Sequence, residues 1–323
     1  MKNIYFIVNP QAGNGHCMKI WRKLEIKCKD LAVPYFVFYT EYRGHAEEIA
    51  ALLASRNSGE EIMIAVGGDG TLHEVENGLK KMNSSISLGF IPAGSGNDFS
   101  RGFHIPPDPM EALHSIIRLL NQEGVCIDTG KILFENEKEH YFLNNMGAGF
   151  DALISYEVNH SKVKSILNRL SLGKLVYVYF LLKKLFTYQC TTVSLMIDGK
   201  KHIFKHTWFV TVSNQPFYGG GMKISPESNP VDGLLDITVV HQLSKLKLLF
   251  VFASVFSGKH TRFKEVSMFK GSLISIQSSS PLFVHADGEF IGHTPLKILV
   301  QPKTRRILTR MPSGSETNIK EGD

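Results

Sequence analysis

The chain has 323 residues, of which 43% are hydrophobic and 20% charged, a composition that excludes a largely disordered protein. This length suits one large domain or two ordinary ones. No apolar run reaches the roughly 18 residues of a membrane span, so we expect a soluble or peripheral protein. The four cysteines include no Cys-x-x-Cys pair, which argues against a disulfide framework or a zinc site and fits a reducing cytoplasm.

The net charge of +6 is unevenly distributed along the chain. Residues 1–127 contain 12 basic and 14 acidic residues, whereas residues 128–323 contain 24 basic and 16 acidic ones. This asymmetry predicts that the second part of the chain meets a polyanionic surface, either membrane lipid or nucleic acid. We do not expect nucleic acid, because no recognisable reading module accompanies the basic residues.

Short β-branched or aromatic runs alternate with helical patterns in the first third of the chain. This alternation predicts an α/β domain in which helices cover both faces of a parallel sheet. Such sheets bind ligands at the carboxyl ends of their strands. The expected strands are 4–8, 35–39, 62–66 and 88–91, and the expected helices are 16–29, 45–55, 72–80 and 109–121.

Glycine-rich stretches follow three of these strands: NPQAGNG at 9–15, GGDGT at 67–71 and PAGSGNDF at 92–99. One such loop is weak evidence, but three at one edge of a sheet predict a phosphate-binding site. They match neither the P-loop nor the dinucleotide fingerprint. An acid, Asp69, stands among these glycines, which makes sense if Mg²⁺ lies between its carboxylate and a phosphate. The alternative is that Asp69 caps the helix that follows it.

Beyond residue 128 the pattern changes to short strands bounded by turns, which predicts a mainly antiparallel β-sandwich. Two helical stretches, 161–187 and 243–257, interrupt it, and the polar tail 312–323 is expected to be disordered. We expect one domain of residues 1–127 with a returning segment at about 301–311, and a second of residues 128–300. The expected strands of the second domain are 140–145, 192–197, 208–213, 235–241, 273–277, 283–286 and 296–300.

Six motifs occur in the order and approximate spacing of one known family: NPQAGNG, GGDGTLHEV, PAGSGNDFSR, NNMGAGFDA at 144–152, DGLLD at 232–236 and HADGE at 285–289. Over roughly residues 4 to 310 the chain resembles the diacylglycerol kinase catalytic-domain family, in particular its soluble bacterial lipid kinases. The resemblance implies a Rossmann-like N-terminal domain of the NAD-kinase and lipid-kinase type. It also implies ATP-dependent phosphorylation of a lipid hydroxyl, with diacylglycerol converted to phosphatidate as the leading reaction.

The same resemblance implies roles for individual residues. Glu289 would accept the proton of the lipid hydroxyl, and Asp69 would act with ATP and Mg²⁺ at the phosphate. A structural Mg²⁺ would bind Asn229, Asp232 and Leu234. The ATP site would be lined by Asn9, Pro10, Gln11, Ala12, Gly13, Thr40, Gly67, Gly68, Asp69, Gly70, Thr71, Leu72, His73, Glu74 and Ser95.

Other interpretations stay open for the function and for some of these residues. Asp287-Gly288 and Asp232-Gly233 are strong turn signals. In the alternative interpretation, Glu289 and Asp232 are turn residues without a role in catalysis or metal binding. An NAD kinase shares GGDGT, but this chain has HEVEN where the Asn-Glu pair of that enzyme is expected. A non-catalytic lipid or nucleotide sensor of the same fold is the third interpretation, which the presence of both Asp69 and Glu289 disfavours.

Residues 161–186 contain six basic residues and no acidic one, with apolar residues at helical spacing. One interpretation is a pair of helices that covers the core and leaves its lysines in water. With a lipid substrate we favour reversible docking on an anionic membrane, at the inner face of the cytoplasmic membrane. Leu175, Tyr179 and Leu182 would insert. The sequence is also compatible with a homodimer.

Overall fold

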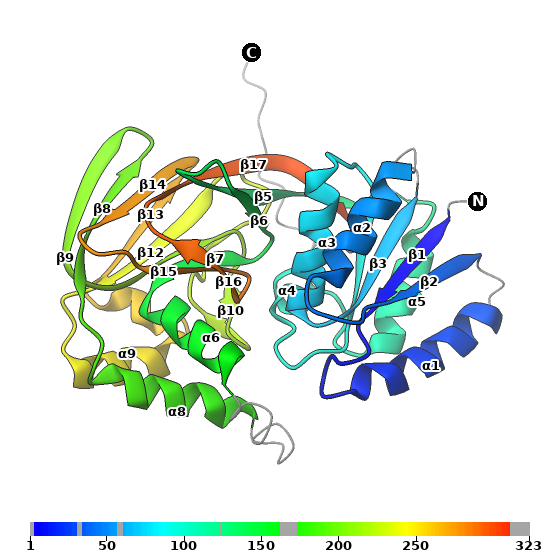
Figure 1. The fold of residues 1–323 in the computed structure, drawn as a ribbon, viewed down its shortest axis with the longest axis horizontal. Coiled ribbons are helices and arrows are strands. Elements are labelled where there is room, and N and C mark those ends of the chain that lie inside the picture. Colours follow the sequence, from blue (N-terminus) through cyan, green and yellow to red (C-terminus); the bar gives the residue numbers. More distant parts are fainter. Residues whose placement is uncertain (1–2, 31–33, 57–60, 123, 162–172, 311–323) are drawn as a thin grey trace.

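Figure 1 shows the protein, a computed structural model, as two halves that lie side by side. The structure describes residues 3–30, 34–56, 61–122, 124–161 and 173–310, without the side chains of 173–178. The expected tail at 312–323 and the first part of the expected helix 161–187 lie outside the described residues.

The N-terminal half is built on four parallel strands in the order β4-β3-β1-β2. β1 and β3 are buried along their whole length, as apolar strands covered on both faces are expected to be. α1 packs with α5, and α2 packs with α3 (Figure 1). The expected α/β domain is confirmed. Its elements are β1 Ile4–Val8, α1 His16–Asp30, β2 Tyr35–Tyr39, α2 His45–Arg56, β3 Ile62–Gly67, α3 Asp69–Lys81, β4 Ser87–Pro92, α4 Asp98–Gly102 and α5 Pro109–Leu119.

The C-terminal half consists mainly of antiparallel strands around a second apolar core, in agreement with the expected sandwich. Its β9 pairs with β7, β8 and β12, and a third apolar cluster joins α6, α8 and α9 to these strands. Its elements are β5 Val125–Phe134, β6 Glu139–Phe142, β7 Asn145–Gly149, α6 Phe150–His160, α8 Gly173–Leu185, β8 Thr191–Ile197, β9 Lys200–Ser213, β10 Phe217–Tyr218, β11 Met222–Lys223, β12 Leu235–His241, α9 Lys245–Val255, a 3-10 turn Lys259–Arg262, β13 Val266–Gly271, β14 Leu273–Ser278, β15 Phe283–Ala286, β16 Glu289–His293 and β17 Leu296–Ile307.

The last strand, β17, joins the two halves (Figure 1). It pairs with β14 and β5 along the C-terminal half, and its end pairs in parallel with β4, where Ile307 lies opposite Leu88. The Arg305 guanidinium near this end donates to the buried Glu76 carboxylate of α3 at 2.6 Å. This pairing agrees with the expected returning segment, while the domain limits themselves stay a prediction.

The prediction of one strand at 140–145 is wrong. β6 ends at Phe142 and β7 begins at Asn145, so the chain leaves the strand conformation between them. The backbone N–H groups of Leu143, Asn144 and Asn145 donate to the Asp287 carboxylate at 3.0, 2.9 and 3.1 Å. Donors used in this way are not available to a continuous strand ladder. A helix directly after β7 was not expected from the sequence either. This helix, α6, contacts the turn that carries Glu289.

Candidate active site

The three glycine-rich loops meet at the carboxyl end of the parallel sheet, as the sequence predicts. The side-chain amide of Asn9 donates to the Thr71 hydroxyl at 2.9 Å, which joins the first loop to the second. The N–H of Ala93 donates to the Gly67 carbonyl at 2.7 Å, which joins the third loop to the second. Gly13 has a φ of +58° and leaves no room for a Cβ atom, which would lie 2.7 Å from the Ala93 oxygen. The three loops therefore pack together beside the N-terminus of α3, and a helix N-terminus is a place where a phosphate can bind.

Asp69, the first residue of α3, links the second loop to α4. Its carboxylate accepts the backbone N–H groups of Asp98 and Phe99 at 3.1 and 3.0 Å. Asp69 thus caps α4 and not the helix that contains it, and a cation would have to use the lone pairs that these two hydrogen bonds leave. Burial, followed by the nearby charge of Asp98, raises the pKa of the Asp69 carboxyl to about 6.

Asp287 joins the C-terminal half to the N-terminal half beside these loops. Besides the three N–H groups that it accepts between β6 and β7, its carboxylate contacts Nδ1 of His73 on α3 at 3.1 Å. Both side chains are buried. Burial lowers the pKa of His73, but the hydrogen bond and the charge of Asp287 outweigh it, so the pKa of His73 is raised. The contact therefore favours the protonated imidazole and a buried ion pair between the halves.

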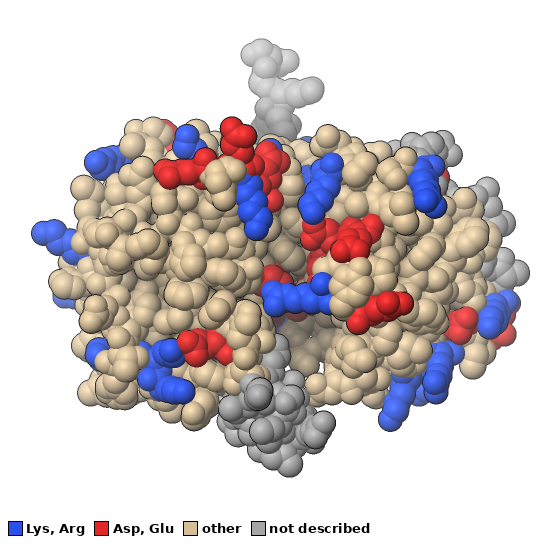
Figure 2. Space-filling model, viewed as in Figure 1, with Lys and Arg blue, Asp and Glu red and all other residues tan. Residues whose placement is uncertain are grey.

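Glu289 lies directly over the loop at 67–71. One of its carboxylate oxygens is 3.2 Å from the position that a Cβ atom on Gly70 would take. The other forms an ion pair with Arg43, which precedes α2 in the N-terminal half. Figure 2 shows acidic and basic side chains meeting across the groove between the halves. The structure thus brings a carboxylate of the second half onto the loop that begins at Gly67.

The turn that carries Glu289 is held from several sides. The hydroxyl of Ser155 and the amide of Asn159, both on α6, donate to the Gly288 carbonyl at 2.7 and 3.1 Å. The N–H of Gly288 donates to Nδ1 of His285 at 3.2 Å. A helix that the sequence did not predict therefore positions the predicted base.

Three residues that were predicted to line the ATP site use their side chains in contacts within the protein. Leu72 is buried, His73 is engaged across the groove, and the Glu74 carboxylate accepts the N–H groups of Gly44 and Ala46 at 2.8 and 3.2 Å. Their part in ATP binding stays a prediction. The remaining predicted residues lie at the same edge of the sheet: Asn9, Pro10, Gln11, Ala12 and Gly13 after β1, Thr40 after β2, Gly67, Gly68, Gly70 and Thr71 at the end of β3 and the start of α3, and Ser95 after β4.

The residues predicted to hold a structural Mg²⁺ form one loop before β12. The Asp232 carboxylate accepts the Leu234 N–H at 3.0 Å, and the Asp232 N–H donates to the Asn229 carbonyl at 3.4 Å. The Lys270 ammonium lies 3.3 Å from the second Asp232 oxygen. Within the described ranges no three His, Cys, Asp or Glu side chains converge to hold a metal ion. A cation at this loop would therefore need carbonyl and water ligands and would compete with Lys270.

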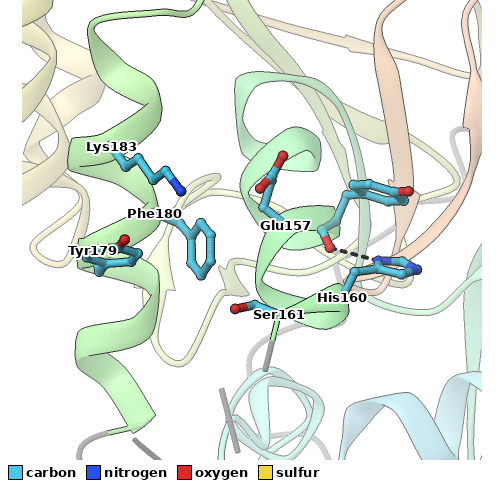
Figure 3. A pocket seen from close by; sticks show the side chains of 7 residues that line it. Glu157, His160, Ser161, Tyr179, Phe180 and Lys183 are labelled. Carbon is cyan, nitrogen blue, oxygen red and sulfur yellow. Dashed lines mark hydrogen bonds between the residues drawn. The ribbon is translucent and has the colours of Figure 1, made fainter. Parts of the chain in front are cut away.

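A hollow of about 290 Å³ opens between α6 and α8, beside the helix that holds the Glu289 turn. Figure 3 shows Phe180 and Lys183 on α8 facing Glu157 on α6 and Ser161 directly after it. An ion pair of 2.7 Å between Lys184 and Glu157 joins the two helices. The hollow has aromatic and charged walls, which suit an amphipathic molecule.

Comparison with protein families identifies the family of the chain. Residues 3–132 match the diacylglycerol kinase catalytic domain, and residues 144–309 match the YegS C-terminal NAD kinase beta sandwich-like domain. The chain is 35% identical to YtlR of Bacillus subtilis (strain 168), whose name places it among the lipid kinases, over 96% of this chain and 100% of that protein. The chain belongs to the diacylglycerol kinase catalytic-domain family. It is a lipid kinase of that family, and kinases with this catalytic domain use ATP.

A further relative agrees with this assignment, and a solved structure agrees with the fold. The chain is 30% identical to the diacylglycerol kinase of Mycobacterium tuberculosis (strain ATCC 25618 / H37Rv), over 94% of this chain and 93% of that protein. The crystal structure of a diacylglycerol kinase from Bacillus anthracis str. Sterne shares the fold, with a TM-score of 0.73, 24% identity and coverage of 96% of this chain and 97% of that one. The expected two-part fold of this lipid kinase is thereby confirmed.

Arg43 and Asp287 are the residues of the site that sequence reasoning missed. Arg43 lies in a loop without glycine-rich character, and only its contact with Glu289 reveals it. Asp287 was recognised as a turn residue, and its positive φ of 47° fits the Asp-Gly turn signal, but the four partners of its carboxylate could not be foreseen. HADGE carried a signal for Asp287, whereas nothing in the sequence pointed to Arg43.

Proposed function

We propose that this lipid kinase transfers the γ-phosphoryl group of ATP to the hydroxyl of diacylglycerol and forms phosphatidate. The observation that carries the proposal is the position of the Glu289 carboxylate over Gly70, at the start of α3. A lipid hydroxyl that donates a hydrogen bond to Glu289 would be beside a phosphate bound at the N-terminus of that helix. The two partners of phosphoryl transfer would then meet in the groove.

The proposed reaction assigns a task to each group. The bond between the γ-phosphorus and the oxygen bridging to the β-phosphate breaks, a bond to the lipid oxygen forms, and the hydroxyl proton passes to Glu289. The glycine-rich loops hold ATP through their N–H groups, with Asp69 beside the phosphates. Arg43 lies close enough to Glu289 to neutralise charge that develops on the transferred group. Mg²⁺ bound with ATP would neutralise the phosphate oxygens.

We also propose a second, structural Mg²⁺ at the loop of Asn229, Asp232 and Leu234. What supports it is a carboxylate with neighbouring carbonyls in one tight loop, next to Asp128 of β5, whose side chain accepts the Gly233 N–H at 2.7 Å. Burial and the charge of Asp232 act together to raise the pKa of Asp128. A cation would relieve this crowding of acidic groups.

The decisive experiment offers labelled ATP and Mg²⁺ to a panel of lipids and, in parallel, to NAD. The panel includes diacylglycerol, monoacylglycerol, phosphatidylglycerol and a sphingoid base, because each presents a hydroxyl to the same groups. We expect transfer to diacylglycerol above the others. Transfer to NAD alone would establish the NAD kinase alternative, and binding without any transfer would establish a sensor.

A further inference from the structure

α9 is apolar on more than one side. Leu248, Val251 and Val255 are buried against the β-strands of the C-terminal half. On the rest of the helix, Leu246 is 64% exposed and Phe250 is 74% exposed. A helix that is apolar all round is normally buried, so large side chains left open mark an interaction surface.

The end of α8 continues this open apolar surface. Tyr179, Leu182 and Phe186 are 48%, 45% and 62% exposed, and they recur at helical spacing. The Lys245 ammonium at the start of α9 donates to the Phe186 carbonyl at 2.5 Å, which fixes the two helix ends side by side. Figure 1 shows both helices at the same lower side of the C-terminal half. We call the surface of Tyr179, Leu182, Phe186, Leu246, Phe250 and Phe256 the α8–α9 face.

Both helices come from segments that lack acidic residues. Residues 161–186 hold six basic residues, and residues 241–264 hold five, with no Asp or Glu in either. The exposed Lys183 lies beside the face on α8, and Figure 2 shows further Lys and Arg side chains along this lower side. Two lysines of these segments are paired with acids of neighbouring elements, Lys184 with Glu157 and Lys247 with Glu265. Apolar side chains beside an excess of basic residues are typical of a surface that enters the headgroup region of an anionic bilayer.

We propose that the α8–α9 face docks this lipid kinase on an anionic membrane, with α9 supplying the most exposed apolar side chains. No helix of the described residues is long and apolar enough to cross a membrane, so the contact is with its surface. The choice of partner rests on the proposed lipid substrate. The face also adjoins the hollow between α6 and α8, where Tyr179 and Lys183 line the wall (Figure 3). A lipid that leaves the bilayer at this face meets the hollow beside α6, which holds the Glu289 turn.

The test measures sedimentation with vesicles of phosphatidylglycerol and phosphatidylcholine, and with phosphatidylcholine alone. Leu246→Asp combined with Phe250→Asp is expected to weaken binding to the anionic vesicles roughly 10- to 100-fold for each side chain withdrawn from lipid. Both positions are exposed, so the melting temperature is expected to stay unchanged. Ile26→Asp is the matched control, because Ile26 is a 62% exposed apolar residue on α1 in the other half.

Lys183→Glu is a second variant, which is expected to weaken the binding and its dependence on salt. Vesicle binding that is equal in wild type and both variants would overturn the proposal. So would a wild-type dimer that the Asp variants dissociate while vesicle binding persists, since a second copy would then cover the face. Phosphorylation of a short-chain diacylglycerol free in solution is expected to be unchanged in the variant that combines Leu246→Asp with Phe250→Asp, because neither residue lines the hollow. If the wild type lacks that activity, the proposed reaction fails, whatever the vesicles show.

Discussion

Arg43 and Glu289 form an ion pair across the groove although they are 246 positions apart in the sequence. The guanidinium comes from the loop before α2, and the carboxylate from the turn that α6 holds. The pair places a positive charge where the phosphoryl group would pass from ATP to the lipid. Arg43 is therefore expected to act in the transfer step and not only in pairing with the base.

Arg43→Ala is expected to lower kcat about 10²- to 10³-fold, the usual effect of removing one preorganised group that stabilises charge in the transition state. The affinity for ATP should change little, and Arg43→Lys should restore part of kcat. Steady-state kinetics with lipid and ATP varied separately test this. Arg56→Ala is the control, since Arg56 is exposed at the far end of α2. A rise in KM with kcat intact would show that Arg43 only binds substrate.

Glu289→Gln is expected to lower kcat about 10²- to 10⁴-fold, because the amide keeps the shape but cannot accept the proton. ATP binding, followed by fluorescence or calorimetry, should persist. The double variant with Arg43→Ala should be less impaired than the product of the two single effects, because the residues act as a pair. A Gln variant within a few fold of wild type would place the base elsewhere.

The raised pKa of Asp69 predicts a pH dependence of stability. The folded protein holds this proton up to about pH 6, whereas an ordinary Asp releases it near 3.8. The folded state therefore binds more protons between these values, and the contribution of Asp69 to the free energy of unfolding rises as pH falls through 6 toward 3.8. Asp69→Asn should flatten this dependence in urea titrations between about pH 7 and pH 4. An unchanged dependence would assign it to other groups.

Removing the Asp287 carboxylate should lower the free energy of unfolding far more than removing an aspartate from another turn. Asp287→Ala leaves three backbone N–H groups and His73 without their acceptor, so we expect a loss of about 3–5 kcal/mol or failure to fold. Asp198→Ala is the matched control, because Asp198 accepts the N–H groups of Ser272 and Leu273 in an exposed turn. Equal losses in urea denaturation would contradict a special role for the contact between the halves.

The proposed structural Mg²⁺ predicts an effect on stability without ATP. Mg²⁺ should raise the melting temperature of the wild type and leave Asp232→Ala unaffected, because a ligand that binds only the folded state stabilises it. Lys270→Met should bind Mg²⁺ more tightly, since the competing ammonium is gone. Equal Mg²⁺ responses in wild type and Asp232→Ala would exclude Asp232 as a ligand.

The parallel strands were predictable because each is a short apolar run that ends at a local signal. β1, for example, ends at Val8 before Asn9-Pro10. β17 shows the limit of this reasoning. It was expected to stop at 300, before Pro302, but the strand continues past an irregularity between Gln301 and Arg305. Its continuation depends on pairing with β5, which no local pattern contains.

The same limit applies to the site. The glycine-rich loops were predictable, since phosphate binding imposes its pattern on consecutive residues. The contact between His73 and Asp287 joins residues 214 positions apart, and its existence depends on how the two halves pack. Resemblance to a family named Glu289, but only the packing reveals Arg43 as its partner.

The path of β17 also bears on how the protein is made. The N-terminal half is synthesised before the C-terminal half, yet β17, which pairs with β4 and supplies Arg305 to the buried Glu76, follows the rest of the C-terminal half in the chain. A nascent chain that stops before Leu296 has an open edge at β4, and its buried Glu76 carboxylate lacks Arg305 and keeps the more distant Lys80 ammonium at 4.0 Å. The N-terminal half is thus completed only after β17 has been synthesised, and a fragment that ends before Leu296 is expected to be less stable than the same half in the whole chain.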